Sequence, residues 1–387
     1  MDCLPFYIGM ICLFVVWYIY DGYLHLLNIL VFFRGLDKQS RLGQHATEPM
    51  LTVLITVFNE EGEIKDRIEN VLEADYPDGK IEILVASDGS TDRTDEIVKN
   101  LGDPRVRLFR PPNRFGKTDT QNQAIQQAWG DIIVFTDAGT RFEKNFLSSI
   151  VLPFSDAQVA AVDGHLVFVK SPSDLSSSQN YYWSFELRLR ELESRLGILA
   201  VASGACLAVR KSLFRQMDTS IGEDCIVPLD VVLQNSKVVH ASTALAYDRM
   251  DNSPEREFRT RVRMTLRNWQ GTWSRPELLN PFHNLGVAWA LWSHKILRWL
   301  SPFFLIGLFI SANIAAYSSE NFLKLPLAVA VDGFYTLALI GWLTNYQTIS
   351  IPGSGTAYNF MLANAGFLVG VIRALIGQKI HAYRSTK

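Results

Sequence analysis

Charged residues are nearly absent from both ends of the chain and abundant in its middle. Residues 1–33 carry only Asp2 and Asp21, with no Lys or Arg, and residues 281–387 carry only nine charged residues. Apolar stretches of this length suit the hydrocarbon of a bilayer, whereas residues 34–280 have the charge content of a soluble domain. The pattern predicts a membrane segment, a globular domain and a second membrane region.

The first apolar stretch predicts a retained N-terminal transmembrane helix within residues 1–33. A cleaved signal peptide is the alternative, but such a segment begins with basic residues and ends in a small-residue cleavage site, and this stretch shows neither. Residues 301–387 predict a C-terminal transmembrane region of about three helices. Residues 281–300 predict an interfacial amphipathic helix, because tryptophans and basic residues fall on different sides. Packing of this helix against the globular domain is the alternative.

Basic residues after the first helix indicate the side of the membrane. Arg34, Lys38 and Arg41 follow it, and cytoplasmic loops are rich in Lys and Arg. We therefore expect an integral protein of the inner or plasma membrane with its globular domain in the cytosol. Three further spans would place the C-terminus outside, although Arg373 and Lys379 favour the inside, so the number of spans stays open.

The overall composition excludes several classes of protein. The net charge is −2, so no basic excess indicates a nucleic-acid partner. The four cysteines show neither C-x-x-C nor zinc-like spacing, which excludes a disulfide scaffold.

The globular region, residues 34–280, alternates short apolar runs with helical patterns. Strands are predicted at residues 51–57, 81–86, 105–109 and 131–136. Strands that alternate with helices of ten or more residues indicate a mostly parallel α/β sheet. Ligand sites in such sheets lie at the carboxyl ends of the strands, which points to residues 57–60, Asp88 and Asp137. A dinucleotide fingerprint and a P-loop are both absent from the sequence.

Six short motifs occur in order between residues 50 and 275. They read T-V-F-N-E-E (56–61), A-S-D-G-S-T-D (86–92), N-R-F-G-K-T (113–118), T-D-A-G-T (136–140), S-G-A-C-L-A-V-R (203–210) and G-E-D (222–224). Together they resemble glycosyltransferase family 2, in particular the membrane-bound branch with cellulose, chitin and hyaluronan synthases and exopolysaccharide transferases. The resemblance implies a GT-A fold, here with N- and C-terminal transmembrane helices, and a nucleotide-sugar donor.

The resemblance implies that the first two motifs bind the nucleoside. Asp88 would accept a hydrogen bond from the nucleobase, and organising a turn is its structural alternative. Phe58 and Glu60 would lie near the nucleoside, with Phe58 in place of the commoner Tyr.

Three basic residues are candidates for binding the diphosphate. Lys117 is a compact cation after a glycine, which suits a phosphate. Arg263 and Arg267 lie on the helix predicted over residues 255–273, and a guanidinium can bind two phosphate oxygens at once. Solvated side chains on an amphipathic helix are the alternative for these two arginines.

Asp137 is the expected ligand of Mg²⁺ or Mn²⁺, because hard cations prefer oxygen ligands. Such a cation would neutralise the charge that develops on the diphosphate leaving group. The family's usual motif is Asp-x-Asp, whereas here Asp137 is followed by Ala138 and Gly139. The missing second carboxylate leaves open a nucleotide-sugar-binding membrane subunit without catalytic activity.

Asp224 is the candidate general base, which an inverting transfer needs beside the acceptor hydroxyl. The resemblance places this Asp at the start of a helix, where a simple helix cap is the alternative. Ser203, Gly204, Glu223 and Trp269 are the candidate acceptor residues. His240 and Asp248 are interpreted as structural.

The resemblance therefore implies an inverting hexosyl- or N-acetylhexosaminyl-transferase. It would move a sugar from a UDP-linked donor to a lipid-linked or growing glycan acceptor at the cytosolic membrane face. A processive polysaccharide synthase coupled to export is the alternative. Processive synthases carry Gln-x-x-Arg-Trp in the region where this chain has R-N-W-Q-G-T-W (267–273), which weakens that alternative. The sequence leaves the oligomeric state open.

Overall fold

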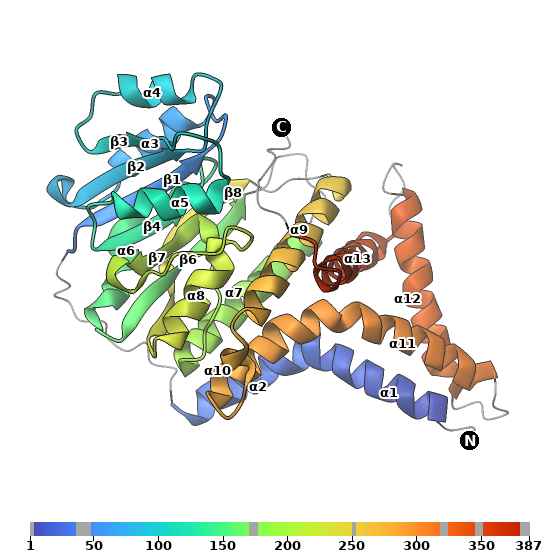
Figure 1. Cartoon of the computed structure of the whole chain (residues 1–387). Helices are drawn as coiled ribbons and strands as arrows, with labels where there is room; N and C mark the ends of the chain where they lie inside the picture. Colours follow the sequence, from blue (N-terminus) through green and yellow to red (C-terminus); the bar gives the residue numbers. More distant parts are fainter. Residues whose placement is uncertain are drawn as a thin grey trace.

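The computed structural model describes six stretches of the chain, residues 4–35, 48–169, 177–249, 253–317, 324–344 and 351–379. A globular α/β part lies on one side, and long helices extend away from it (Figure 1). This arrangement confirms the predicted fold class, an α/β sheet domain with apolar helices at both ends of the chain.

An eight-stranded mixed sheet, in the order β3-β2-β1-β4-β7-β6-β8-β5, forms the core of the globular part. The strands are β1 Leu51–Val57, β2 Ile81–Ser87, β3 Val106–Phe109, β4 Ile132–Thr136, β5 Arg141–Phe142, β6 Val159–Val169, β7 Leu207–Arg210 and β8 Lys237–Arg249. Strands β3, β2, β1 and β4 are parallel to one another. Every residue of β1 and β2 is buried, as expected of parallel strands covered by helices on both faces.

The other half of the sheet was not predicted from the sequence. Strand β7 runs antiparallel to both β4 and β6, β8 is parallel to β6, and β5 is antiparallel to β8. Strand β5 has two residues, and the outer parts of β6 and β8 alternate buried with exposed positions. Neither a two-residue strand nor a strand end with alternating burial gives the continuous apolar run that identifies a parallel strand.

Seven helices complete the described globular part. They are α3 Ile64–Leu72, α4 Thr94–Asn100, α5 Lys117–Gln126, α6 Phe146–Val151, α7 Ser177–Leu196, α8 Glu223–Leu233 and α9 Pro254–Trp273. Helices α5 and α8 begin inside the third and sixth motifs, at Lys117 and Glu223. Their N-termini therefore place these motifs at the carboxyl edge of the parallel strands.

Within the described residues, four helical runs are long and apolar enough to cross a bilayer: Leu4–Phe33, Leu285–Tyr317, Leu325–Thr344 and Ser354–Leu375. The first comprises α1 (Leu4–Trp17), a π-helical turn (Tyr18–Gly22) and α2 (Tyr23–Phe33). The second comprises α10 (Leu285–Ala290), a π-helical segment (Leu291–Ile296) and α11 (Leu297–Tyr317). The last two are α12 and α13.

The segment predicted as an interfacial helix, residues 281–300, is not a separate element. From Leu285 it is continuous with α11, and part of its apolar stripe packs on the globular domain, while its contact with a membrane surface stays a prediction. Ile296 and Trp299 are buried in the same cluster as residues of the sheet and of α8. Trp292 of the same stripe is 38% exposed, so only part of the stripe is covered by protein.

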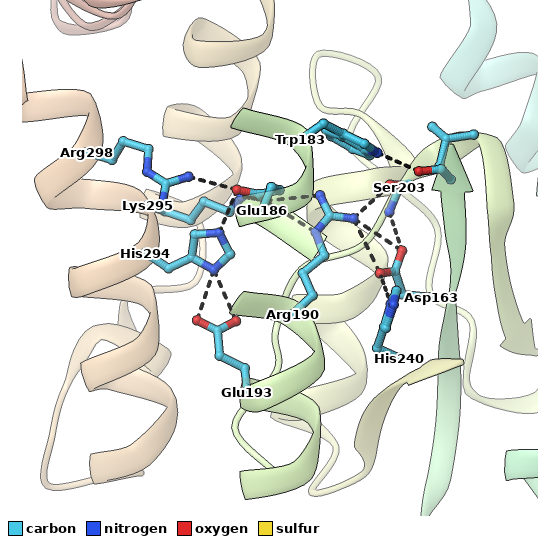
Figure 2. Close-up of polar contacts among 11 residues, drawn as sticks. Asp163, Trp183, Glu186, Arg190, Glu193, Ser203, His240, His294, Lys295 and Arg298 are labelled. Carbon is cyan, nitrogen blue, oxygen red and sulfur yellow. Dashed lines mark hydrogen bonds and ion pairs between the residues drawn. The ribbon is translucent and has the colours of Figure 1, made fainter. Parts of the chain in front are cut away.

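A cluster of buried ions joins the globular domain to this long helix (Figure 2). Glu186 of α7 accepts hydrogen bonds from His294 Nε2 at 2.9 Å, Lys295 Nζ at 3.0 Å and Arg298 Nη1 at 2.8 Å. The other imidazole nitrogen of His294 lies 2.9 Å from Glu193 Oε1, an arrangement that a doubly protonated imidazole satisfies. Burial opposes ionisation of Glu186, but His294 and Lys295 hold its pKa well below the usual range.

We expect Glu186→Gln to lower the free energy of unfolding by about 3–5 kcal/mol, because it leaves buried cations without their counter-ion. Equilibrium unfolding of the full chain in mixed detergent micelles would measure this loss. The control is Glu191→Gln on the same helix, which removes surface pairs with Arg188 and Arg195 and should cost less than about 1 kcal/mol. Equal losses in the two variants would contradict the role of Glu186.

Candidate functional site

Asp88, at the end of β2, organises the loop that leads into α5. Its Oδ1 accepts hydrogen bonds from the backbone N–H groups of Phe115 and Gly116 and from the Thr120 hydroxyl, each at 3.0 Å. Gly116 has a φ of +95°, a conformation that favours glycine. Asp88 is therefore held against the third motif, as its turn-organising interpretation expects, and its contact with a nucleobase stays a prediction.

An arginine that the sequence analysis missed covers the end of β1. The guanidinium of Arg114 lies 3.5 Å from the ring centroid of Phe58, and its Nε lies 3.5 Å from Asp88 Oδ2. The backbone N–H of Glu60 donates to the Thr94 hydroxyl at 2.9 Å, which ties the first motif to the N-terminus of α4. The sequence could have indicated Arg114, because it belongs to the quoted motif N-R-F-G-K-T, from which only the lysine was proposed as a site residue.

Lys117 brings together residues from three motifs. Its Nζ lies 2.7 Å from Asp137 Oδ1 and 2.7 Å from Glu223 Oε1. These residues come from the N-terminus of α5, the loop after β4 and the N-terminus of α8, so distant parts of the sequence meet here. Burial opposes the charge of Lys117, but the two carboxylates raise its pKa above the usual range. Burial likewise opposes ionisation of Glu223, while Lys117 holds the pKa of that carboxyl below its usual value.

Gly204 lies directly against the Glu223 carboxylate. A Cβ added at Gly204 would lie 2.7 Å from Glu223 Oε1, so the close approach requires a glycine. The neighbouring Ser203 is buried, and its polar groups are engaged by the ion cluster. Its backbone N–H donates to Asp163 Oδ1 at 2.7 Å, and its hydroxyl accepts from Arg190 Nη1 at 2.7 Å (Figure 2). The structure thus places Ser203 behind the site as a link to α7.

Lys117, Asp137 and Glu223 form what we call the lysine centre. Asp224 and Arg267 lie beside it. Burial, followed by the neighbouring charge of Glu223, raises the pKa of Asp224, and Arg267 opposes that rise. Arg267 reaches from α9 to the start of α5, where its Nη2 donates to the Thr118 hydroxyl at 3.1 Å. One half-buried carboxylate with an elevated pKa therefore lies at the N-terminus of α8, next to two cations.

Two other predicted site residues, Trp269 and Arg263, also lie on α9. Trp269 packs between Trp273 and Trp299, with ring centroids 5.8 and 6.0 Å away. Trp269 thus packs among other aromatic side chains, and its contact with an acceptor stays a prediction. Arg263 is half-buried one turn before Arg267, and its contact with a diphosphate stays a prediction.

The loop after β4 faces an acidic residue from the far end of the sheet. A Cβ added at Gly139 would lie 3.5 Å from Asp248 Oδ1, and the Thr140 hydroxyl lies 3.4 Å from Asp248 Oδ2. Burial and the charge of Asp137 raise the pKa of Asp248 to about 6, against a backbone hydrogen bond that lowers it. Within the described residues no group of three or more His, Cys, Asp or Glu side chains forms a ready metal site. Two carboxylates nevertheless suit a hard cation whose remaining ligands are phosphate oxygens and water.

Comparison with known proteins finds a family match over part of the chain. Residues 52–218 match the model of Glycosyl transferase family 2. An N-acetylglucosaminyltransferase of Rhizobium meliloti (strain 1021) is 24% identical over 318 residues, which cover 76% of this chain and 70% of that protein. The poly-beta-1,6-N-acetyl-D-glucosamine synthase of Staphylococcus aureus (strain MSSA476) is 27% identical over 205 residues, which cover 51% of this chain and 49% of that protein.

A solved structure shares the fold across nearly the whole chain. It is the mannosyltransferase PcManGT from Pyrobaculum calidifontis, solved in complex with GDP-Man and Mn²⁺. The TM-score is 0.71 at 20% sequence identity, and the match covers 95% of this chain and 99% of that chain. This likeness confirms the GT-A fold expected from the sequence.

We expect Lys117→Met to destabilise the protein by about 2 kcal/mol at neutral pH, because buried Glu223 loses its counter-ion while Lys117 itself is partly exposed. The wild-type pair stabilises the fold above the unfolded pKa of Glu, about 4.3, and below that of Lys, about 10.4. The difference in Tm between variant and wild type should therefore be largest near pH 7 and shrink below about pH 4. Lys237→Met, which removes a surface pair with Asp156, is the control. A pH-independent difference would contradict this account.

Proposed function

We propose that this glycosyltransferase of family 2 moves a hexosyl or N-acetylhexosaminyl group, with inversion, from a UDP-linked donor to a lipid-linked or growing glycan acceptor at the cytosolic membrane face. The observation that carries the proposal is the convergence of Lys117, Asp137 and Glu223 beside Asp224 at the carboxyl edge of the parallel strands. Relatives named for N-acetylglucosamine support an N-acetylhexosamine donor.

The donor would lie across the loops after β1, β2 and β4. Phe58 and Asp88 lie at the nucleoside end, while Lys117 and Arg267 supply positive charge for the diphosphate. A divalent cation held by Asp137 would neutralise charge on the departing diphosphate, and the Mn²⁺ complex of the related mannosyltransferase supports this. When the diphosphate binds, Lys117 gains an anionic partner in addition to its present carboxylates.

Asp224 would act as the general base. As the new glycosidic bond forms and the bond to the diphosphate breaks, a carboxylate oxygen of Asp224 takes the proton of the acceptor hydroxyl. Its raised pKa makes it a stronger base than an exposed carboxylate. A binding-only subunit has no use for such a group, so its environment favours an enzyme.

The acceptor side of the domain is docked on a membrane helix. Helix α9, which carries Arg267, runs alongside α13 (Figure 1). A Cβ added at Gly370 of α13 would lie 2.6 Å from the Cβ of Thr265, so the two helices approach closely through glycine. This proximity supports an acceptor that is delivered from the membrane.

The acidic residues of the described membrane helices do not form one group. Asp21 pairs with His25 at 3.1 Å, and both side chains are largely exposed. Asp332 accepts a hydrogen bond from Asn313 at 2.9 Å on other helices. A polysaccharide pathway would gather polar groups between the helices; the hydrogen-bonded group there, Tyr20, Ser301 and Asn364, is neutral.

We expect Asp224→Asn to lower kcat by about 10²–10⁴-fold, because the amide cannot accept the proton. Release of UDP and transfer of labelled sugar by the purified full chain in membrane lipid nanodiscs would measure the change. Donor affinity should stay within a few fold of wild type, and the surface variant Asp156→Asn is the matched control. Full activity of Asp224→Asn, or no turnover by wild type with any common sugar donor, would end the proposal.

The pH profile gives a second test of the base. Because the pKa of Asp224 is raised, kcat/KM should fall at a higher pH on the acidic side than an ordinary carboxylate would allow. Arg267 favours the ionised form, so Arg267→Gln should move this acidic limb to still higher pH, apart from any loss in maximal rate. An acidic limb that stays in place in Arg267→Gln would assign it to another group.

A further inference from the structure

The fourth motif lacks its second carboxylate, and the tertiary structure brings another to the same place. We propose that Asp248 of β8 acts with Asp137 as a ligand of the divalent cation, in place of the carboxylate absent at Gly139. This inference rests on the proposed function, because it concerns the cation that accompanies the nucleotide-sugar donor.

Sheet pairing brings Asp248 to the motif. In the antiparallel pair of β5 and β8, Arg141 lies opposite Tyr247, so Asp248 falls beside the turn that precedes β5. That turn is closed by the backbone N–H of Thr140, which donates to the carbonyl oxygen of Asp137 at 3.3 Å. The Thr140 hydroxyl lies 3.4 Å from Asp248 Oδ2. The turn thus has one carboxylate at its start and another against its end.

A carboxylate at position 139 would occupy the same region as the carboxylate of Asp248. A Cβ at residue 139 would contact Asp248 Oδ1 at 3.5 Å, so an Asp side chain there would point its carboxylate into the same region. Two carboxylates in contact repel each other unless a cation lies between them. A glycine at 139 leaves room for the one that β8 provides.

Asp248 is partly buried and has no direct ion pair. Across the described residues no Lys or Arg lies within ion-pair distance of it, and its hydrogen-bond partners are the Thr140 hydroxyl and the backbone N–H of Arg249. The charge of the nearby buried Arg67 favours the ionised form of Asp248, but this arginine directs Nη1 to Asn70 and Nη2 to Thr136 and forms no direct pair with the carboxylate. A partly buried carboxylate without a direct ion pair is costly, and a divalent cation shared with Asp137 would offset that cost.

The test moves the carboxylate between the two positions. Mn²⁺ binding to the full-length protein in detergent, with and without UDP, would be measured by electron paramagnetic resonance. We expect Asp248→Ala to weaken Mn²⁺ binding at least tenfold. The double variant Asp248→Ala with Gly139→Asp should restore the affinity to within a few fold of wild type. The matched control Asp156→Asn should bind as wild type does.

The outcomes separate this inference from the proposed function. Wild-type Mn²⁺ affinity in Asp248→Ala, or failure of Gly139→Asp to rescue a folded double variant, would overturn the role of Asp248. Folding is followed by the Tm of each variant, so loss of structure is recognised separately. If Mn²⁺ binding depends on Asp248 but the wild type transfers no sugar, the inference stands and the proposed function fails. If the wild type transfers sugar but Asp248→Ala binds Mn²⁺ with unchanged affinity, the proposed function stands and the role of Asp248 fails.

Discussion

The carboxylate of Glu186 is the interaction on which the arrangement of the two parts depends. It lies in the protein interior where the globular α7 meets the long helix that continues into α11, and three basic side chains converge on it. Buried ion clusters contribute little net stability, because desolvation offsets attraction, but removing one member is costly. Such a cluster therefore fixes how the domain sits on its membrane helices.

The same cluster extends toward the candidate site (Figure 2). Arg190 pairs with both Glu186 and Asp163 and donates to the hydroxyl of Ser203. The next residue, Gly204, lies against Glu223, which pairs with Lys117. The ion cluster thus reaches Ser203 through charge-assisted hydrogen bonds, and the next residue, Gly204, continues toward the lysine centre through packing against Glu223.

The lysine centre shows why a motif can depart from its family pattern without losing the charge balance of the site. Lys117 neutralises two carboxylates from different motifs. The corner at Gly139 lacks the usual second acid but faces Asp248 from another strand. Residue identity at one position is therefore a weaker guide than the set of charges that the fold gathers around it.

Sequence alone determined the order of membrane and globular parts, the four parallel strands and the carboxylates that follow them. These features depend on local patterns, namely long apolar runs, the spacing of apolar residues and the polar residue at each strand end. Tertiary structure alone decided the antiparallel half of the sheet, the sharing of Lys117 between Asp137 and Glu223, and the place of Asp248 beside Gly139. These contacts join residues from about 20 to more than 100 positions apart, and strand register and helix packing, which no local pattern encodes, bring them together.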